Sequence, residues 1–259
     1  MLDRYEDFKK DFFQLSKIDL NAYKENQMKR RIDSYMGRYR LERYSDFFAL
    51  LRKDKLFYDK FVAYLTINVS EFYRNPAQWH TLETEVIPYL KMMFGKKLRI
   101  WSAACSTGDE PYSLAMVFKE LIPGGDIQII ATDLDKEVLK KAKKGFYSDK
   151  SIKDLPARYK DKYIVDDQSG IVRVADSIRN CITFEEHNLL KDPYPTGFDL
   201  IVCRNVLIYF TEEAKKEIYT KFASSLKKDG ILFVGSTEQI INCERFGFNS
   251  FRSFFYQNL

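Results

Sequence analysis

The sequence predicts an α/β protein in two parts: a small all-helical N-terminal domain, then a doubly wound, mostly parallel sheet. Residues 1 to about 68 show helical periodicity and no convincing strand, whereas the chain from Trp79 onward alternates apolar runs with helical segments. Residues 147–180 are more chain than the connection between the second helix and the strand at 182 needs, and they predict a small inserted antiparallel β-subdomain. We therefore expect domains at residues 1–70 and 71–259, with the insertion inside the second.

The N-terminal domain contains a basic amphipathic helix. Its predicted buried face is formed by Met28, Ile32, Tyr35, Met36 and Tyr39. Lys24, Arg31 and Arg38, spaced by seven residues, lie along its flank. Residues 24–43 hold seven basic and three acidic side chains, which is most of the chain's net charge of +5. Ser45 and Asp46 are predicted to cap the start of the next helices.

The second domain follows a strand and helix alternation. The predicted strands are residues 98–103, 127–132, 182–186, 198–203 and 231–235, and the helices between them are 111–121, 135–144 and 212–226. Within the insertion, two short strands flank a turn at residues 167–170, which is a hairpin signal. The aromatic, alternating tail at 246–259 suits a closing antiparallel edge pair.

The segment from Leu98 to Ser113 predicts a ligand site. An apolar strand runs into a turn of small residues, and a helix opens with Asp109 and Glu110. A dinucleotide fingerprint needs more glycines than the single Gly108, and the two acids would repel a pyrophosphate. Asp133 ends the next strand, where ribose hydroxyls are held in doubly wound folds. S-adenosylmethionine fits these features because it carries an ammonium, a sulfonium and no phosphate.

Composition narrows the class of protein further. No apolar run approaches the roughly 20 residues that span a bilayer, and the first residues do not form a signal peptide, so we expect a cytoplasmic protein that is not membrane-inserted. The four cysteines are far apart with no C-x-x-C pair, which predicts reduced and mostly buried thiols. With two histidines and no Cys/His cluster, we expect no metal site.

Several motifs together resemble one family, the CheR glutamate methyltransferases that act on chemoreceptors in bacterial chemotaxis. The motifs are residues 68–74, 101–113, 131–133, 188–189 and 203–210. Cys105 and Asp109 stand where this family more usually has Ala and Glu, and both keep the size or charge that the site needs. The resemblance covers nearly the whole chain.

The resemblance implies a Rossmann-like, S-adenosylmethionine-dependent methyltransferase domain that forms glutamyl methyl esters and S-adenosylhomocysteine during receptor adaptation. The residues it implies for cofactor binding are Asn68, Ser70, Arg74, Glu110, Asp133, Asn188, Leu189, Arg204 and Asn205. Arg74 and Tyr209 are our candidates for holding the substrate carboxylate. Lys24, Arg31 and Arg38 would dock onto the acidic helical bundle of a receptor in a membrane array. In some family members the insertion also binds a short receptor peptide, and the sequence leaves this open here.

Other interpretations compete with these. In the structural alternative, Asn68 and Ser70 cap a helix, Asn188 serves a turn, Arg204 and Asn205 form a polar strand end, and Tyr209 fits an apolar core. A nucleic-acid methyltransferase would use the basic helix on phosphates, but residues 203–206 lack the Asn/Asp-Pro-Pro-aromatic motif of amino-methylating DNA enzymes. A scaffold that senses the cofactor without turnover would need the same pocket. We expect a chemoreceptor partner and no nucleic acid.

Overall fold

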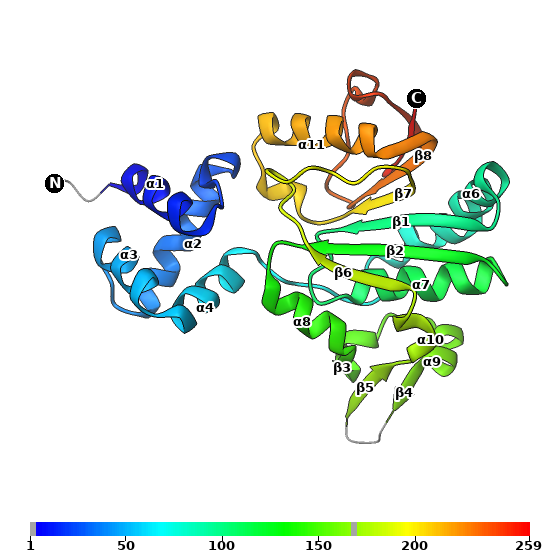
Figure 1. The fold of residues 1–259 in the computed structure, drawn as a ribbon, viewed down its shortest axis with the longest axis horizontal. Helices are drawn as coiled ribbons and strands as arrows, with labels where there is room; N and C mark the ends of the chain where they lie inside the picture. Colours follow the sequence, from blue (N-terminus) through cyan, green and yellow to red (C-terminus); the bar gives the residue numbers. More distant parts are fainter. Residues whose placement is uncertain (1–3, 167–169) are drawn as a thin grey trace. The chain divides into compact units, whose positions relative to one another are not determined.

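The computed structural model describes residues 4–166 and 170–259, and the chain divides into two compact units (Figure 1). The smaller unit holds the described residues up to Asn68 together with Tyr209–Lys216. The larger unit holds Val69–Ile208 and Glu217–Leu259. Each unit is described by itself below.

The smaller unit is built from helices around an aromatic core. Its elements are α1 (Tyr5–Ser16), η1 (Leu20–Ala22), α2 (Glu25–Arg38), α3 (Tyr44–Lys53) and α4 (Lys55–Leu65). Phe47 and Phe61 are fully buried, with ring centroids 4.9 Å apart. Residues 209–216 belong here because Tyr23 and Phe210 form a β-bridge and the Lys24 N–H donates to the Tyr209 carbonyl at 2.8 Å.

Two expectations for this unit need correction. On α2 the predicted face is buried at Met28, Ile32, Tyr35 and Met36, but Tyr39 is 45% exposed because the helix has already ended at Arg38. Ser45 and Asp46 do not cap a helix start, since α3 begins one residue earlier, at Tyr44, without a side-chain cap. The capping residue is Asp54, which accepts from the Phe57 N–H at 3.0 Å and starts α4.

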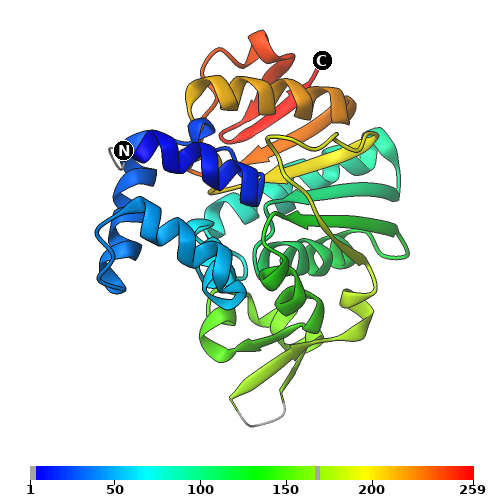
Figure 2. The same ribbon diagram turned by 60° about the vertical axis from the view of Figure 1, so that its left-hand side comes forward.

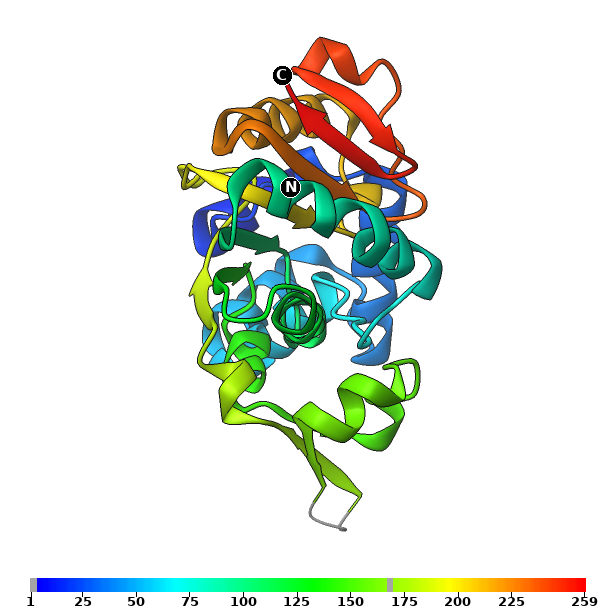
Figure 3. The ribbon, with the colours of Figure 1, turned by 90° about the vertical axis from the view of Figure 1, so that its right-hand side faces the viewer.

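The larger unit contains a seven-stranded sheet in the order β6-β2-β1-β7-β8-β10-β9. Its strands are β1 (Lys97–Ala103), β2 (Asp126–Asp133), β6 (Ile182–Glu186), β7 (Phe198–Cys203), β8 (Leu226–Val234), β9 (Phe248–Arg252) and β10 (Phe255–Asn258). The first five in this order are parallel, and β10 and β9 close the edge in antiparallel fashion (Figure 3). The predicted doubly wound sheet and the closing edge pair are confirmed.

Helices cover both faces of this sheet, as alternate residues of β1 show. Ile100 belongs to the core cluster that also holds residues of α6 (Ile87–Phe94) and α7 (Asp109–Leu121). Trp101 points the other way and packs edge-on against Phe222 of α11 (Glu212–Ser225), with centroids 5.5 Å apart. The remaining sheet helix is α8 (Lys136–Lys144), next to β2 and β6.

The stretch before β1 forms helices that we did not predict from the sequence. They are α5 (Pro76–Thr81), the π-helical segment η2 (Leu82–Val86) and α6. Trp79, Leu82, Val86 and Leu90 are all fully buried. Their three- and four-residue spacing was a helical signal visible in the sequence.

The predicted insertion forms a three-stranded antiparallel sheet in the order β3-β5-β4, separate from the large sheet (Figure 2). Its elements are β3 (Phe146–Ser148), η3 (Asp149–Ile152), α9 (Ala157–Tyr163), β4 (Ile164–Asp166), β5 (Ile171–Val174) and α10 (Asp176–Arg179). Strands β4 and β5 are the predicted hairpin strands, and residues 167–169 of the predicted turn lie outside the described residues. The strand β3 and the helices α9 and α10 were not predicted.

The described residues are relevant to the expectations about thiols, membrane spans and metal sites. All four cysteines are free thiols, and three of them are buried. Across residues 4–166 and 170–259, no helix is both long and apolar enough to cross a bilayer. In the same ranges, no group of three or more His, Cys, Asp or Glu side chains is arranged to hold a metal ion.

Candidate functional site

The turn between β1 and α7 has an unusual backbone. Ala104, Ser106 and Gly108 all have left-handed conformations, with φ of 64°, 49° and 93°. A Cβ on Gly108 would lie 2.9 Å from the Ala142 Cβ and 3.0 Å from the Tyr147 hydroxyl. The turn therefore needs glycine at this position and small residues around it, because a left-handed backbone disfavours bulky side chains.

Asp133, at the end of β2, fixes this turn. Its Oδ2 accepts from the Ser106 N–H at 2.8 Å and its Oδ1 from the Asp135 N–H at 3.0 Å. Burial raises the pKa of Asp133 to about 6, although these backbone hydrogen bonds lower it in part. Each carboxylate oxygen has a second lone pair, so Asp133 can still accept from a ligand.

Two acids lie in the first turn of α7, where the helix dipole favours negative charge. Glu110 accepts from the Ser102 hydroxyl at 2.8 Å and pairs with Arg204 at 3.3 Å. Burial raises the pKa of Glu110, and Arg204 opposes that shift. Burial also raises the pKa of Asp109, which the Thr107 hydroxyl at 2.6 Å and Ser70 oppose by hydrogen bonding.

The Arg204 side chain forms more contacts within the protein than the sequence predicted. Its side chain is 2% exposed, and Nη2 donates to the Arg74 carbonyl at 2.7 Å and to Gln78 Oε1 at 2.9 Å. Its guanidinium lies 4.8 Å from the centroid of the Phe233 ring. This side chain therefore links β7 to α5 and to the acid at the mouth of α7.

The chain around Arg74 is tightly held. Tyr73 and Asn75, on either side of it, are left-handed, with φ of 55° and 62°. The Tyr73 N–H donates to the Ser113 hydroxyl at 3.1 Å, and the Trp79 indole donates to the Arg74 carbonyl at 2.9 Å. The Arg74 guanidinium itself is partly exposed and contacts the Val69 carbonyl at 3.2 Å.

Glu238 is a residue of this region that sequence reasoning missed. Its carboxylate accepts from the backbone N–H groups of Asn205 at 2.7 Å, Gly235 at 2.8 Å and Ile208 at 3.2 Å. Glu238 thus joins the loops that follow β7 and β8. An acid shortly after an apolar strand was the available signal, but nothing local identifies its partners.

The Asn188-Leu189 pair follows β6. The Asn188 side chain accepts from the Leu190 N–H at 2.9 Å, so Asn188 forms a turn. Leu189 is buried, and its carbonyl accepts from the Tyr194 hydroxyl at 2.8 Å. The neighbouring His187 N–H donates to the Asp133 carbonyl at 3.0 Å, which brings this turn to the end of β2.

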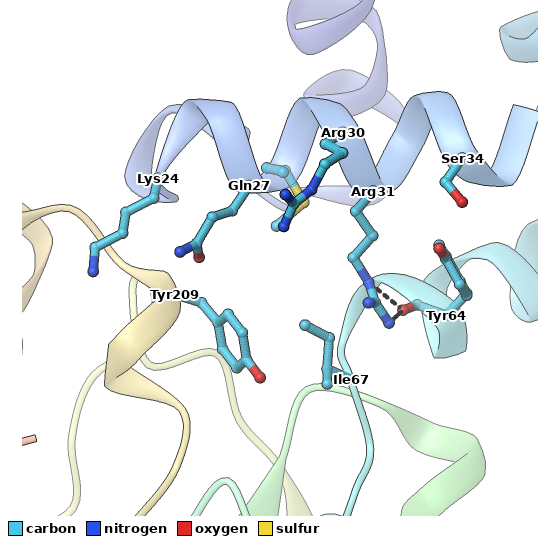
Figure 4. Close-up of a pocket in the computed structure, with 9 residues that line it drawn as sticks. Lys24, Gln27, Arg30, Arg31, Ser34, Tyr64, Ile67 and Tyr209 are labelled. Atoms are coloured by element: carbon cyan, nitrogen blue, oxygen red, sulfur yellow. Dashed lines mark hydrogen bonds between the residues drawn. The ribbon is translucent and has the colours of Figure 1, made fainter. Parts of the chain in front are cut away.

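Several predicted site residues belong to the smaller unit. A cavity of about 540 Å³ there is lined by Lys24, Gln27, Met28, Arg30, Arg31, Ser34, Tyr64, Ile67 and Tyr209 (Figure 4). Arg31 Nε donates to the Tyr64 carbonyl at 2.8 Å, so this side chain caps the C-terminus of α4. Arg31 and Arg38 lie 4.2 and 4.5 Å from the centroid of the Tyr64 ring. Burial lowers the pKa of Arg31.

The predicted site residues are thus divided between the units. Glu110, Asp133, Arg204 and Asn205 meet at the carboxyl ends of strands in the larger unit, which also contains Ser70 and Arg74. Asn68 and Tyr209 belong to the smaller unit, where the Asn68 side chain donates to the Thr66 hydroxyl at 3.0 Å. The joint action of Arg74 and Tyr209 stays a prediction.

Family models match both parts of the chain. Residues 3–66 match the CheR methyltransferase all-alpha domain, and residues 68–254 match the CheR methyltransferase SAM binding domain. A chemotaxis protein methyltransferase of Listeria innocua is 42% identical over 96% of this chain and 98% of its own length. The protein of that name from Escherichia coli is 36% identical over 71% of this chain and 65% of its own length.

Among solved structures, a TehB-like SAM-dependent methyltransferase from Corynebacterium glutamicum has a TM-score of 0.40 and 16% identity, over 70% of this chain and 92% of that one. The two family models together span nearly all of the chain and agree with its helical unit and its doubly wound unit. This protein therefore belongs to the CheR family of S-adenosylmethionine-dependent chemotaxis methyltransferases.

Proposed function

We propose that this protein methylates glutamate side chains of chemoreceptors, using S-adenosylmethionine and releasing S-adenosylhomocysteine. Membership of the family over both units is the observation that supports this most strongly. The protein would act in receptor adaptation, in the cytoplasm, where receptor arrays would recruit it. No role for a metal ion or a nucleic acid is needed.

The residues at the ends of β1 and β2 fit the cofactor. The Ser106 hydroxyl is buried and has no hydrogen-bond partner among the described residues, so it can serve a ligand. The acids Asp109, Glu110 and Asp133 suit a ligand with positive charge. We infer that the site is completed by Asn68, Ser70, Arg74, Asn188, Leu189, Arg204 and Asn205. When bound, S-adenosylmethionine supplies an electrophilic methyl group on its sulfonium.

For the substrate carboxylate, the protein must supply correct positioning and need not supply acid-base catalysis. A glutamate carboxylate has an ordinary pKa of about 4.3, so it is already ionised at neutral pH and needs no general base. Arg74 and Tyr209 would hold this carboxylate. We propose that Arg74 engages one oxygen only, because bonding to both would stabilise the anion and weaken its attack. Correct alignment of two reactants can lower the barrier by about 7 to 11 kcal/mol.

The basic side chains of the smaller unit would meet the acidic face of a receptor helix. Lys24, Arg31 and Arg38 are the proposed docking residues, and opposed charges speed encounter and fix register. Because Arg31 also caps α4, reversing its charge would disturb the fold as well as docking. Arg38 and Lys24 are the cleaner probes.

The docking test compares charge reversals. We expect Lys24→Glu with Arg38→Glu to raise the KM for a receptor fragment about tenfold and to leave the affinity for S-adenosylhomocysteine unchanged, since the long-range field acts on the receptor. Lys10→Glu with Lys53→Glu, which reverses two exposed lysines on α1 and α3, is the control matched in charge. Equal KM values for the double variant and the control would rule out docking through these residues.

The function itself is tested by transfer of labelled methyl from S-adenosylmethionine to a purified chemoreceptor cytoplasmic fragment. Mild alkali then releases methanol from carboxyl esters. Base-labile label in the receptor supports the proposal. Cofactor binding without such label would contradict it and would favour a cofactor sensor, and label in DNA or RNA would favour a nucleic-acid methyltransferase.

A further inference from the structure

A buried carboxylate outside the proposed cofactor contacts joins three separate segments. Glu83 lies on the π-helical segment η2, and its side chain is 8% exposed. Its Oε1 accepts from the hydroxyls of Tyr73 at 2.8 Å and Tyr159 at 2.7 Å, and its Oε2 pairs with Arg158. Because Arg158 and Tyr159 both belong to α9, one carboxylate connects the insertion to the residue that precedes Arg74.

The segment that Glu83 holds is one that needs support. We call residues 70–75 the Arg74 segment. A left-handed conformation at an aromatic residue such as Tyr73 is unfavourable and persists only where the surroundings enforce it. The Tyr73 ring stacks on Trp79 with centroids 5.0 Å apart, and its hydroxyl is fixed by Glu83. Glu83 therefore helps to set the backbone from which the Arg74 side chain extends.

The insertion contacts this segment at two further residues. The Phe72 N–H donates to the Ser151 carbonyl at 3.2 Å, and its ring meets that of Tyr147 edge-on at 4.8 Å. Glu71 forms an ion pair with Lys153 at 3.5 Å. Tyr147 also donates to the Thr107 carbonyl, at 2.6 Å, in the turn after β1. The insertion thus supports both the Arg74 segment and the proposed cofactor turn.

We propose that Glu83 is a positioning residue for methyl transfer, and that Tyr159 of the insertion acts on Arg74 through Glu83 and Tyr73. This inference rests on the proposed role of Arg74 in holding the substrate carboxylate. It gives the insertion a part in the reaction that does not depend on peptide docking. A displacement of α9 would move Glu83 and with it the Arg74 segment.

The test removes single hydroxyl groups from α9. Tyr159→Phe keeps the buried ring and loses the bond to Glu83, and Tyr163→Phe is its control on the same helix, since Tyr163 donates to Glu120 near the C-terminal end of α7. We expect Tyr159→Phe to lower kcat about tenfold, as loss of a hydrogen bond to a charged acceptor predicts. KM for the receptor fragment should change less than about twofold, because docking uses other residues, and affinity for S-adenosylhomocysteine, which Arg74 is also proposed to contact, should fall by less than kcat does.

Hydrogen exchange measures the same effect without any substrate. We expect faster amide exchange over residues 70–75 in Tyr159→Phe and in Glu83→Gln, and wild-type exchange there in Tyr163→Phe. In the Glu83→Gln background, Tyr159→Phe should lower kcat by less than it does in the wild type, because the amide oxygen of Gln is a weaker acceptor than the carboxylate.

The outcomes separate this inference from the proposed function. Unchanged exchange at residues 70–75 in Tyr159→Phe, or an equal loss of kcat in Tyr163→Phe, would overturn the role of Glu83. If the wild-type protein transfers no methyl to the receptor fragment, the proposed function fails, while the exchange measurement still decides whether Glu83 positions the Arg74 segment.

Discussion

Gly108 is the position at which the turn after β1 has least room. Its φ of 93° and the 2.9 Å approach of Ala142 both exclude a side chain. We expect Gly108→Ala to lower the free energy of unfolding by about 2 to 4 kcal/mol, through backbone strain and overpacking. Urea unfolding checks this. Gly37→Ala in α2 is the control, since a Cβ there meets nothing within 4 Å and should stabilise the helix by about 0.5 to 1 kcal/mol.

Asp133 makes stability depend on pH. Because burial raises its pKa from 3.8 to about 6, the folded protein binds this proton more tightly than the unfolded chain does. The resulting stability is complete below the unfolded pKa and is lost as pH rises through about 6. The difference in unfolding free energy between wild type and Asp133→Asn should therefore fall by about 2 kcal/mol from about pH 4.5 to about pH 7. A constant difference in urea unfolding at the two pH values would contradict this pKa.

The backbone N–H groups that follow β7 and β8 need hydrogen-bond acceptors, and one carboxylate accepts from three of them. Glu238 accepts three backbone N–H groups, and a side chain on Gly235 would collide with it. In Glu238→Gln an amide NH₂ replaces one acceptor and faces a backbone donor. We expect a loss of about 1 to 3 kcal/mol in unfolding free energy, measured by urea titration. Glu244→Gln, an exposed neighbour on η5 (Cys243–Phe246), should change it by less than about 0.5 kcal/mol.

Helix α4 shows how one side chain can serve two purposes. Its N-terminus is capped by Asp54 and its C-terminal carbonyl at Tyr64 by Arg31, which comes from α2. The flank of α2 that carries Arg31 is also the proposed docking surface. A basic residue on this helix is therefore not automatically available to a partner, and the contacts of each one decide how it should be probed.

The chain as a whole carries a net charge of +5, most of it between residues 24 and 43. If this field steers an acidic receptor, the KM for the receptor fragment should rise about fivefold between about 50 mM and about 300 mM NaCl, because salt screens long-range attraction. Affinity for S-adenosylhomocysteine should stay within about twofold over that range, since a buried site is screened less. Initial rates and calorimetry at the two salt concentrations test this. A KM independent of salt would exclude steering.

The strands and the turn after β1 could be predicted from the sequence because their signals are local. Residues 98–103 and 198–203 are short apolar runs, and both became strands of the central sheet. The small residues from Ala103 to Gly108 and the acids Asp109 and Glu110 indicated a cofactor site within one stretch of chain. The helices at 76–94 have an equally local pattern in the spacing of their buried residues, so they too are predictable from the sequence.

Contacts between distant residues were decided only by the tertiary structure. Arg204 meets Gln78 and Glu110, Glu238 meets Asn205, and Tyr159 meets Glu83. Tyr209 packs in the unit formed by residues far earlier in the chain. Local periodicity records which side chains are buried, but it carries no information about which buried polar groups become partners, because that depends on how the sheet orders its strands. The sequence by itself thus determined the strands of the large sheet, the turn after β1 and the family resemblance, and the tertiary structure decided which distant side chains become partners.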